Sequence, residues 1–123
     1  MIDYCFVIQG RLAGLNEVTE ANRSHWAKGA NLKKTETQKV VLAAQQQLKG
    51  VRITQPVMLE IVWYEKNKKR DIDNVASGVK FILDGLVAAG VLINDSQKYV
   101  KGLVHSFAVD NLAPRIEIKI KAV

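Results

Sequence analysis

The sequence has few residues that could build a covalent or histidine-based site. Cys5 is the only cysteine among 123 residues, which excludes an internal disulfide and a cysteine-rich zinc site. The two histidines, His25 and His105, are too few for a histidine-based zinc site without help from carboxylates. A chain with so little cysteine suits a reducing compartment, so we expect a cytoplasmic protein.

Long apolar stretches are also missing. No run of about 18 apolar residues is present, which argues against a membrane-spanning helix. The N-terminus lacks a positively charged segment followed by an apolar run, so we expect no secretion signal. There is no internal repeat or low-complexity linker. The sequence therefore predicts a single domain over residues 1–123 that has no membrane partner.

Positive charge is what the sequence has in excess. Lys and Arg number 18 against 12 Asp and Glu, for a formal net charge of +6, and 48% of the residues are hydrophobic. That apolar fraction is sufficient for a core, and the charge excess on a short chain points to a polyanionic partner. Charge alone does not identify the partner, because many basic proteins never bind nucleic acid.

Strand-like and helix-like patterns succeed one another along the chain. Alternating or continuous apolar residues predict strands at 4–8, 56–64, 99–109 and 115–123. Helical spacing predicts helices at 18–26, 32–48 and 74–89, with an interruption at Gly29 and an end at Gly90. Asp110-Asn111 provides a turn, so we expect a C-terminal antiparallel hairpin. The predicted fold is an α/β two-layer domain, with a mixed sheet of about four strands and helices on one face.

Two aspartates directly follow a basic run. Asp71 and Asp73 come after Lys68, Lys69 and Arg70. In an extended chain, residues two apart point to the same side, so two such carboxylates repel unless a cation or proton lies between them. Carboxylate oxygens suit Mg²⁺ or Mn²⁺. The alternative is that one aspartate caps the following helix, a role that does not need both.

More polar residues follow this pair. On a helix with about 100° per residue, Asp73, Lys80 and Asp84 share the face opposite the aliphatic stripe. Alternatively, Lys80 and Asp84 form a surface ion pair, and Asn94-Asp95 is a turn. A metal-dependent nuclease explains both the carboxylates and the nearby cations, because the ion activates water while Lys and Arg hold phosphates. Lys80 would then stabilise the transition state.

Segments 70–74, 80–86 and 89–95 together resemble the RusA family of crossover-junction endodeoxyribonucleases, which are phage- and prophage-borne Holliday junction resolvases. The Gly-containing stretch 10–17 is similar to the N-terminal loop of that family. The resemblance implies an α/β homodimer that uses Mg²⁺, with Mn²⁺ as a substitute. It implies paired, symmetric incisions in four-way junction DNA during recombination and repair.

The resemblance also assigns roles by position. Asp71, Asp73 and Asp95 correspond to metal-binding catalytic carboxylates and Lys80 to the catalytic lysine, and the supporting positions are Asp84 and Asn74. Two departures concern the spacing of Lys80, seven residues after Asp73, and Asn94-Asp95, where some relatives have two aspartates. Two other functions stay open: a branched-DNA-binding protein without catalysis, and a nuclease that acts on forks or flaps.

A second basic region surrounds the first predicted helices. We expect DNA contacts from two groups of cations: Lys68, Lys69 and Arg70, and Arg23, Lys28, Lys33 and Lys34. The alternative is a solvated polar surface. Trp63 is expected in the core, whereas three roles are open for Trp26: packing, stacking on an unpaired base, or contact between copies in a dimer.

Overall fold

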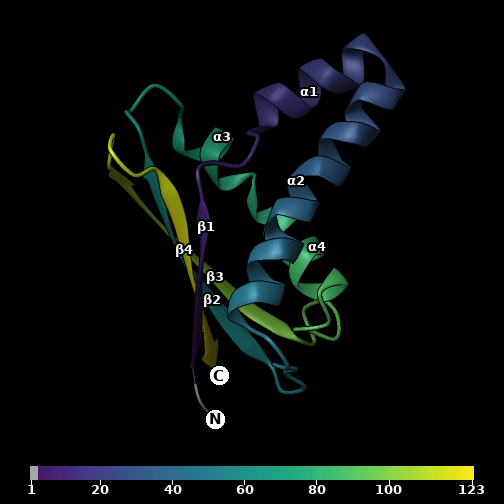
Figure 1. Ribbon diagram of the computed structural model, residues 1–123, viewed down its shortest axis with the longest axis vertical. Helices are drawn as coiled ribbons and strands as arrows, with labels where there is room; N and C mark the ends of the chain where they lie inside the picture. The colour runs from purple at the N-terminus through teal and green to yellow at the C-terminus, as the bar shows by residue number, and fades with distance from the viewer. Residues whose placement is uncertain (1–2) are drawn as a thin grey trace.

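The computed structural model describes residues 3–123, which form one sheet layer and one helical layer (Figure 1). The elements in chain order are β1 (Tyr4–Gln9), α1 (Leu15–Ser24), α2 (Trp26–Gln47), β2 (Val57–Glu65), α3 (Ile72–Ala76), α4 (Val79–Ala88), β3 (Val100–Val109) and β4 (Arg115–Ala122). The predicted α/β class with a four-stranded mixed sheet is confirmed. Within residues 3–123, no helix combines the length and the apolar character that crossing a membrane requires.

The strand order in the sheet is β1-β4-β2-β3. β4 runs antiparallel to both β1 and β2, while β3 pairs with β2 in parallel. The predicted C-terminal hairpin is therefore wrong, because β2 lies between β3 and β4. The turn exists, since Oδ1 of Asp110 accepts hydrogen bonds from the backbone N–H groups of Leu112 and Ala113. A turn reverses the chain, but burial decides which neighbour a strand acquires.

Burial explains the central place of β4. Its inward residues Ile116, Ile118 and Ile120 are each 1% exposed or less, together with Trp63 of β2. They face the helical layer, where Gly85 of α4 lets that helix approach α2 closely. The other face of the sheet carries polar groups, such as the ion pair of Lys121 with Glu60 at 3.1 Å. The helices thus pack on one face of the sheet, as expected.

α2 is one continuous helix, although the sequence predicted an interruption at Gly29. Gly29 is buried, and a Cβ atom at this position would collide with the side chain of Asn22 on α1. Glycine is required because the two helices approach closely here, and this packing outweighs its helix penalty of about 1 kcal/mol. The predicted boundaries at 26 and 32 are replaced by a short turn at His25.

The helix predicted over 74–89 is two helices, α3 and α4. The hydroxyl of Ser77 donates to the carbonyl of Asn74 at 2.6 Å, and the N–H of Gly78 donates to the carbonyl of Val75, three residues back. Such i-to-i−3 bonding is the tighter pattern of a 3₁₀ turn. The turn ends α3 after little more than one turn and separates it from α4.

Candidate active site

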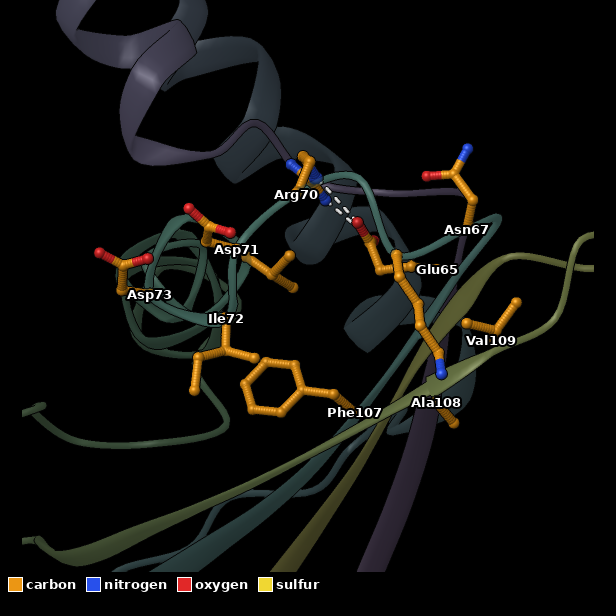
Figure 2. A pocket seen from close by; sticks show the side chains of 11 residues that line it. Glu65, Asn67, Arg70, Asp71, Ile72, Asp73, Phe107, Ala108 and Val109 are labelled. Atoms are coloured by element: carbon orange, nitrogen blue, oxygen red, sulfur yellow. Dashed lines mark hydrogen bonds and ion pairs between the residues drawn. The ribbon is translucent and has the colours of Figure 1, made fainter.

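A pocket of about 890 Å³ opens between the start of α3 and the end of β3 (Figure 2). Phe107 and Val109 contribute apolar side chains from β3. Asp71 and Asp73 line the pocket from the start of α3, and their carboxylates point away from Phe107. The pocket therefore joins an apolar surface to the acidic pair that the sequence singled out.

Asp71 and Asp73, here called the acidic pair, lie at the beginning of a helix, where Asp71 is still extended and Asp73 is already helical. Asp71 occupies the N-cap position of α3, but its side chain accepts no capping hydrogen bond. Asp73 accepts only the backbone N–H of the next residue, Asn74, at 2.9 Å. The capping alternative therefore fails for Asp71, and both carboxylates stay exposed.

Salt bridges separate the acidic side chains of the chain into two groups. All 12 acids lie within residues 3–123, and eight of them have a Lys or Arg within 4.0 Å. The four without such a cation are Glu20, Asp71, Asp73 and Asp95. All three aspartates assigned as metal ligands thus belong to this small group, although the protein has an excess of cations.

Arg70 was expected to contact DNA, but its side chain binds other parts of the protein. Its Nε and Nη2 donate to the two carboxylate oxygens of Glu65 at 2.7 and 2.9 Å, and its Nη1 donates to the carbonyl of Leu12 at 3.1 Å. The side chain is only 15% exposed, so its guanidinium is already engaged within the protein. Arg70 instead ties the N-terminal loop to the segment before α3 and thereby positions the neighbouring Asp71.

Sequence reasoning missed Glu65, although the alternation of β2 contains a signal for it. The inward positions of this strand run through Leu59, Ile61 and Trp63, and the next inward position is Glu65. An acid at the end of a buried row needs a partner cation, because burying an unpaired charge is costly. The nearest candidate that follows in the sequence is the basic run 66–70, which contains Arg70.

Asn74 of α3 contacts the N-terminal loop and the first turn of α1. Its Oδ1 accepts the backbone N–H of Asn16 at 3.0 Å. Gly14 packs so closely against Asn74 that a Cβ atom there would collide with it. The N-terminal loop is therefore held at Arg70 and at Asn74, which stand on either side of the acidic pair in the sequence.

Lys80 and Asp84 form the ion pair that was one of the two alternatives. Both lie on α4, and Nζ of Lys80 is 3.0 Å from Oδ1 of Asp84. The hydrogen bond to Asp84 raises the pKa of Lys80 above its ordinary value, and the charge of Asp95 adds a smaller contribution. Lys80 therefore remains protonated, and it is largely exposed.

The predicted meeting of Asp71, Asp73 and Asp95 is not found. Within residues 3–123, no group of three or more His, Cys, Asp or Glu side chains is placed to hold a metal ion. The separate expectation that Asp73, Lys80 and Asp84 share one helix face required a single helix, and the turn at Ser77 and Gly78 interrupts that helix. Asp95 lies in the loop after α4, where Asn94 accepts the N–H of Ser96 at 2.7 Å as a turn residue.

The acidic pair by itself still fits a hard divalent cation. It offers carboxylate oxygens only, and no Lys or Arg side chain within residues 3–123 neutralises it. Mg²⁺ keeps most of its water and typically binds proteins through one or two carboxylates together with substrate phosphates. The donor set therefore suits Mg²⁺ better than zinc, which prefers nitrogen and sulfur ligands.

The remaining predicted DNA contacts are exposed. Lys68 and Lys69 precede the acidic pair, and the others lie on α1 and the first half of α2: Arg23, Lys28, Lys33 and Lys34. None of these six forms a salt bridge within the described residues. Their charges are therefore available to a polyanion.

An α/β domain with an unneutralised acidic pair beside exposed lysines fits the class of hydrolases that act on phosphodiesters. The family described as Endodeoxyribonuclease RusA matches residues 18–121 of the chain. The protein therefore belongs to the RusA endodeoxyribonuclease family, as the resemblance predicted. The match includes the acidic pair, Lys80 and Asp95, whereas the loop at 10–17 lies outside it. A search of curated proteins finds no match.

Proposed function

We propose that the protein resolves four-way DNA junctions by paired, Mg²⁺-dependent incisions, in recombination and repair. The observation that supports this most is the distribution of salt bridges. The chain has a net charge of +6, yet within residues 3–123 four acids have no Lys or Arg within 4.0 Å: Asp71, Asp73, Asp95 and, on α1, Glu20. Such a selection is expected where the missing partner is a divalent ion, with Mn²⁺ able to replace Mg²⁺.

The proposed roles follow from the positions of the side chains. Asp71 and Asp73 would hold the ion, and Asp95 would approach them when DNA or a partner subunit closes the site. Bound Mg²⁺ supplies an ionisable water and neutralises charge on the phosphate. Lys80, whose protonated form is further stabilised by its contact with Asp84, donates to an oxygen of the scissile phosphate as charge develops there.

We propose that the working unit is a homodimer. A four-way junction presents two equivalent strands, and a protein with two-fold symmetry places two identical sites on them. Sedimentation of the purified protein at several concentrations measures this. The proposal would be contradicted by a mass of one chain at all concentrations without DNA, together with one bound chain per junction when DNA is present.

The test of the catalytic proposal is the substitution Asp73→Asn. Purified protein is incubated with a synthetic four-way junction and Mg²⁺, and cutting and binding are measured separately. We expect cutting to fall by more than about 100-fold, because loss of the ion removes several kcal/mol of transition-state stabilisation. Binding should persist or tighten, because a repulsive negative charge is removed.

Glu20→Gln is the matched control, because Glu20 lies outside the proposed site and, within residues 3–123, likewise forms no salt bridge. It should leave cutting unchanged. If Asp73→Asn cuts at the wild-type rate, the assigned site is wrong. A panel of forks, flaps and four-way junctions tests the substrate, and preferential cutting of forks or flaps would replace the junction assignment.

A further inference from the structure

An exposed tryptophan lies at the tip of α1 and α2, the region that we call the helical arm (residues 15–34). Trp26 is 78% exposed, an unusual state for so large an apolar side chain. The ring of His25 stacks on it, with centroids 5.7 Å apart and planes inclined by 26°. Nδ1 of His25 accepts the N–H of Ala27 at 3.1 Å, so the backbone holds the stacked histidine in place.

The helical arm extends away from the sheet (Figure 1). α2 has 22 residues, a length of about 33 Å at 1.5 Å per residue. Its far end is fixed to β1, where the amide of Gln47 exchanges hydrogen bonds of 2.7 and 2.8 Å with the backbone of Val7. Near the tip, Gly29 packs against Asn22 of α1. Trp26 is therefore carried on a firm support and not on a flexible loop.

The sequence on either side of Trp26 has charge of one sign. Between Glu20 and Glu36 the sequence contains no acid and four cations, which are Arg23, Lys28, Lys33 and Lys34. None of them forms a salt bridge in the part of the chain that the structure describes. An exposed aromatic ring among unpaired cations is the combination by which proteins hold single-stranded nucleic acid, with the ring stacked on a base and cations on phosphates.

The base of the helical arm is connected to the acidic pair. The N–H of Asn16, in the first turn of α1, donates to Asn74 of α3 at 3.0 Å. Arg70, next to Asp71, donates to Leu12 just before the arm. DNA held at the tip would therefore be held at a set position relative to the acidic pair.

We propose that Trp26 stacks on an unpaired nucleobase of branched DNA, while the neighbouring cations bind the adjoining phosphates. This inference rests on the proposed function and names the feature of the substrate that the helical arm recognises. A branch point offers bases that are not enclosed by a duplex, and stacking on an aromatic ring tolerates any base sequence. The enzyme would thus distinguish branched DNA from plain duplex by the exposure of its bases.

Tryptophan fluorescence tests the proposal directly, because the chain has only two tryptophans and Trp63 is 1% exposed. The probes are a single-stranded oligonucleotide, a four-way junction with unpaired bases at its centre, and a blunt duplex of equal length. We expect quenching by the first two probes and little by the duplex. Trp26→Phe, which retains only Trp63, should show no change on any of them.

Binding measurements provide a second readout. Trp26→Ala should weaken binding of the single-stranded oligonucleotide about tenfold, the lower part of the range for loss of one stacked base, and Trp26→Phe should retain most of the affinity. Leu42→Ala is the matched control, because Leu42 is a half-exposed apolar residue on the same helix. It should bind as the wild type does.

Two outcomes would overturn the inference. One is unquenched Trp26 together with wild-type affinity of Trp26→Ala. The other is a wild-type dimer that becomes a monomer in Trp26→Ala, which would assign Trp26 to contact between copies. Either result leaves the nuclease proposal intact if Asp73→Asn still abolishes cutting. Conversely, wild-type cutting by Asp73→Asn defeats the nuclease site but not the stacking.

Discussion

The start of α3 and the helical arm both combine charges with apolar side chains, yet they treat their charges differently. Before α3, the guanidinium of Arg70 donates hydrogen bonds to Glu65 and to the carbonyl of Leu12. The two aspartates that follow, Asp71 and Asp73, form no salt bridge within the described residues. In the helical arm, four cations form no salt bridge within residues 3–123, and the same arm carries an exposed tryptophan. The comparison teaches that the unpaired charges, more than the total charge, indicate what a surface binds.

Among the variants that test this comparison, Arg70→Ala should have the largest effect on stability. Removal of one partner from a mostly buried ion pair leaves Glu65 uncompensated, at a cost of about 3 kcal/mol in the free energy of unfolding. Urea denaturation measures this loss. Cutting should also fall, because the loop and Asp71 lose their common support. Lys69→Ala is the control and should unfold as the wild type does; equal stability of the two variants would contradict the positioning role of Arg70.

A smaller effect is expected from neutralising the helical arm. The double substitution Lys33→Ala with Lys34→Ala should weaken DNA binding at all sequences and lower the salt dependence by about one unit for each phosphate that is no longer neutralised. Titrations at several salt concentrations measure the slope. Lys98→Ala with Lys101→Ala, on the loop before β3 and on β3, is the control pair. An unchanged slope in the arm variant would assign its lysines to solvent.

Lys80 is a cation that is paired within the protein, and the substitution Asp84→Asn should lower the pKa of Lys80. The hydrogen bond from Lys80 to Asp84 raises the pKa of Lys80, so its loss lowers that pKa. If protonated Lys80 is required, the alkaline limb of kcat/KM against pH should move to lower pH, with little change near neutral pH. An unshifted limb in Asp84→Asn would show that another group sets it.

The smallest predicted effect concerns His105 on β3. Nε1 of Trp63 donates to Nδ1 of His105 at 2.9 Å, and burial lowers the pKa of His105. The neutral form is therefore favoured by folding, and its contribution is present above the unfolded pKa of about 6.5 and is lost as pH falls toward the folded value. The free energy of unfolding should decrease below about pH 6.5. His105→Gln should flatten that dependence, whereas an identical pH profile would contradict the assignment.

Much of the secondary structure follows from local pattern. The strict alternation of Ile116, Ile118 and Ile120 with polar residues predicted β4 almost to its ends, because the two faces of a strand meet different surroundings. The helix at 74–89 was predicted too long. Its apolar spacing does not reveal that Ser77 and Gly78 take a tighter turn, which depends on packing against Trp63 and Leu12.

In the candidate site, too, the sequence predicted some features and packing decided others. The residue types and their order, with the resemblance they carry, predicted the family and named the acidic pair. They did not predict that Arg70 would bind Glu65, since this pair forms only when the end of β2 and the start of α3 fold together. They also placed Asp73, Lys80 and Asp84 on one face of a helix that is in fact interrupted.

The sequence by itself determined the α/β class, most of the strands, the cationic surplus and the identity of the aspartates, because these depend on residue type and on periods of two or 3.6 residues. Only the tertiary structure decided that β4 lies between β1 and β2, which charges are paired, and that Trp26 stands exposed on the helical arm. These features depend on contacts between residues far apart in the chain. Such contacts stabilise the protein only once the sheet and the helical layer have packed together.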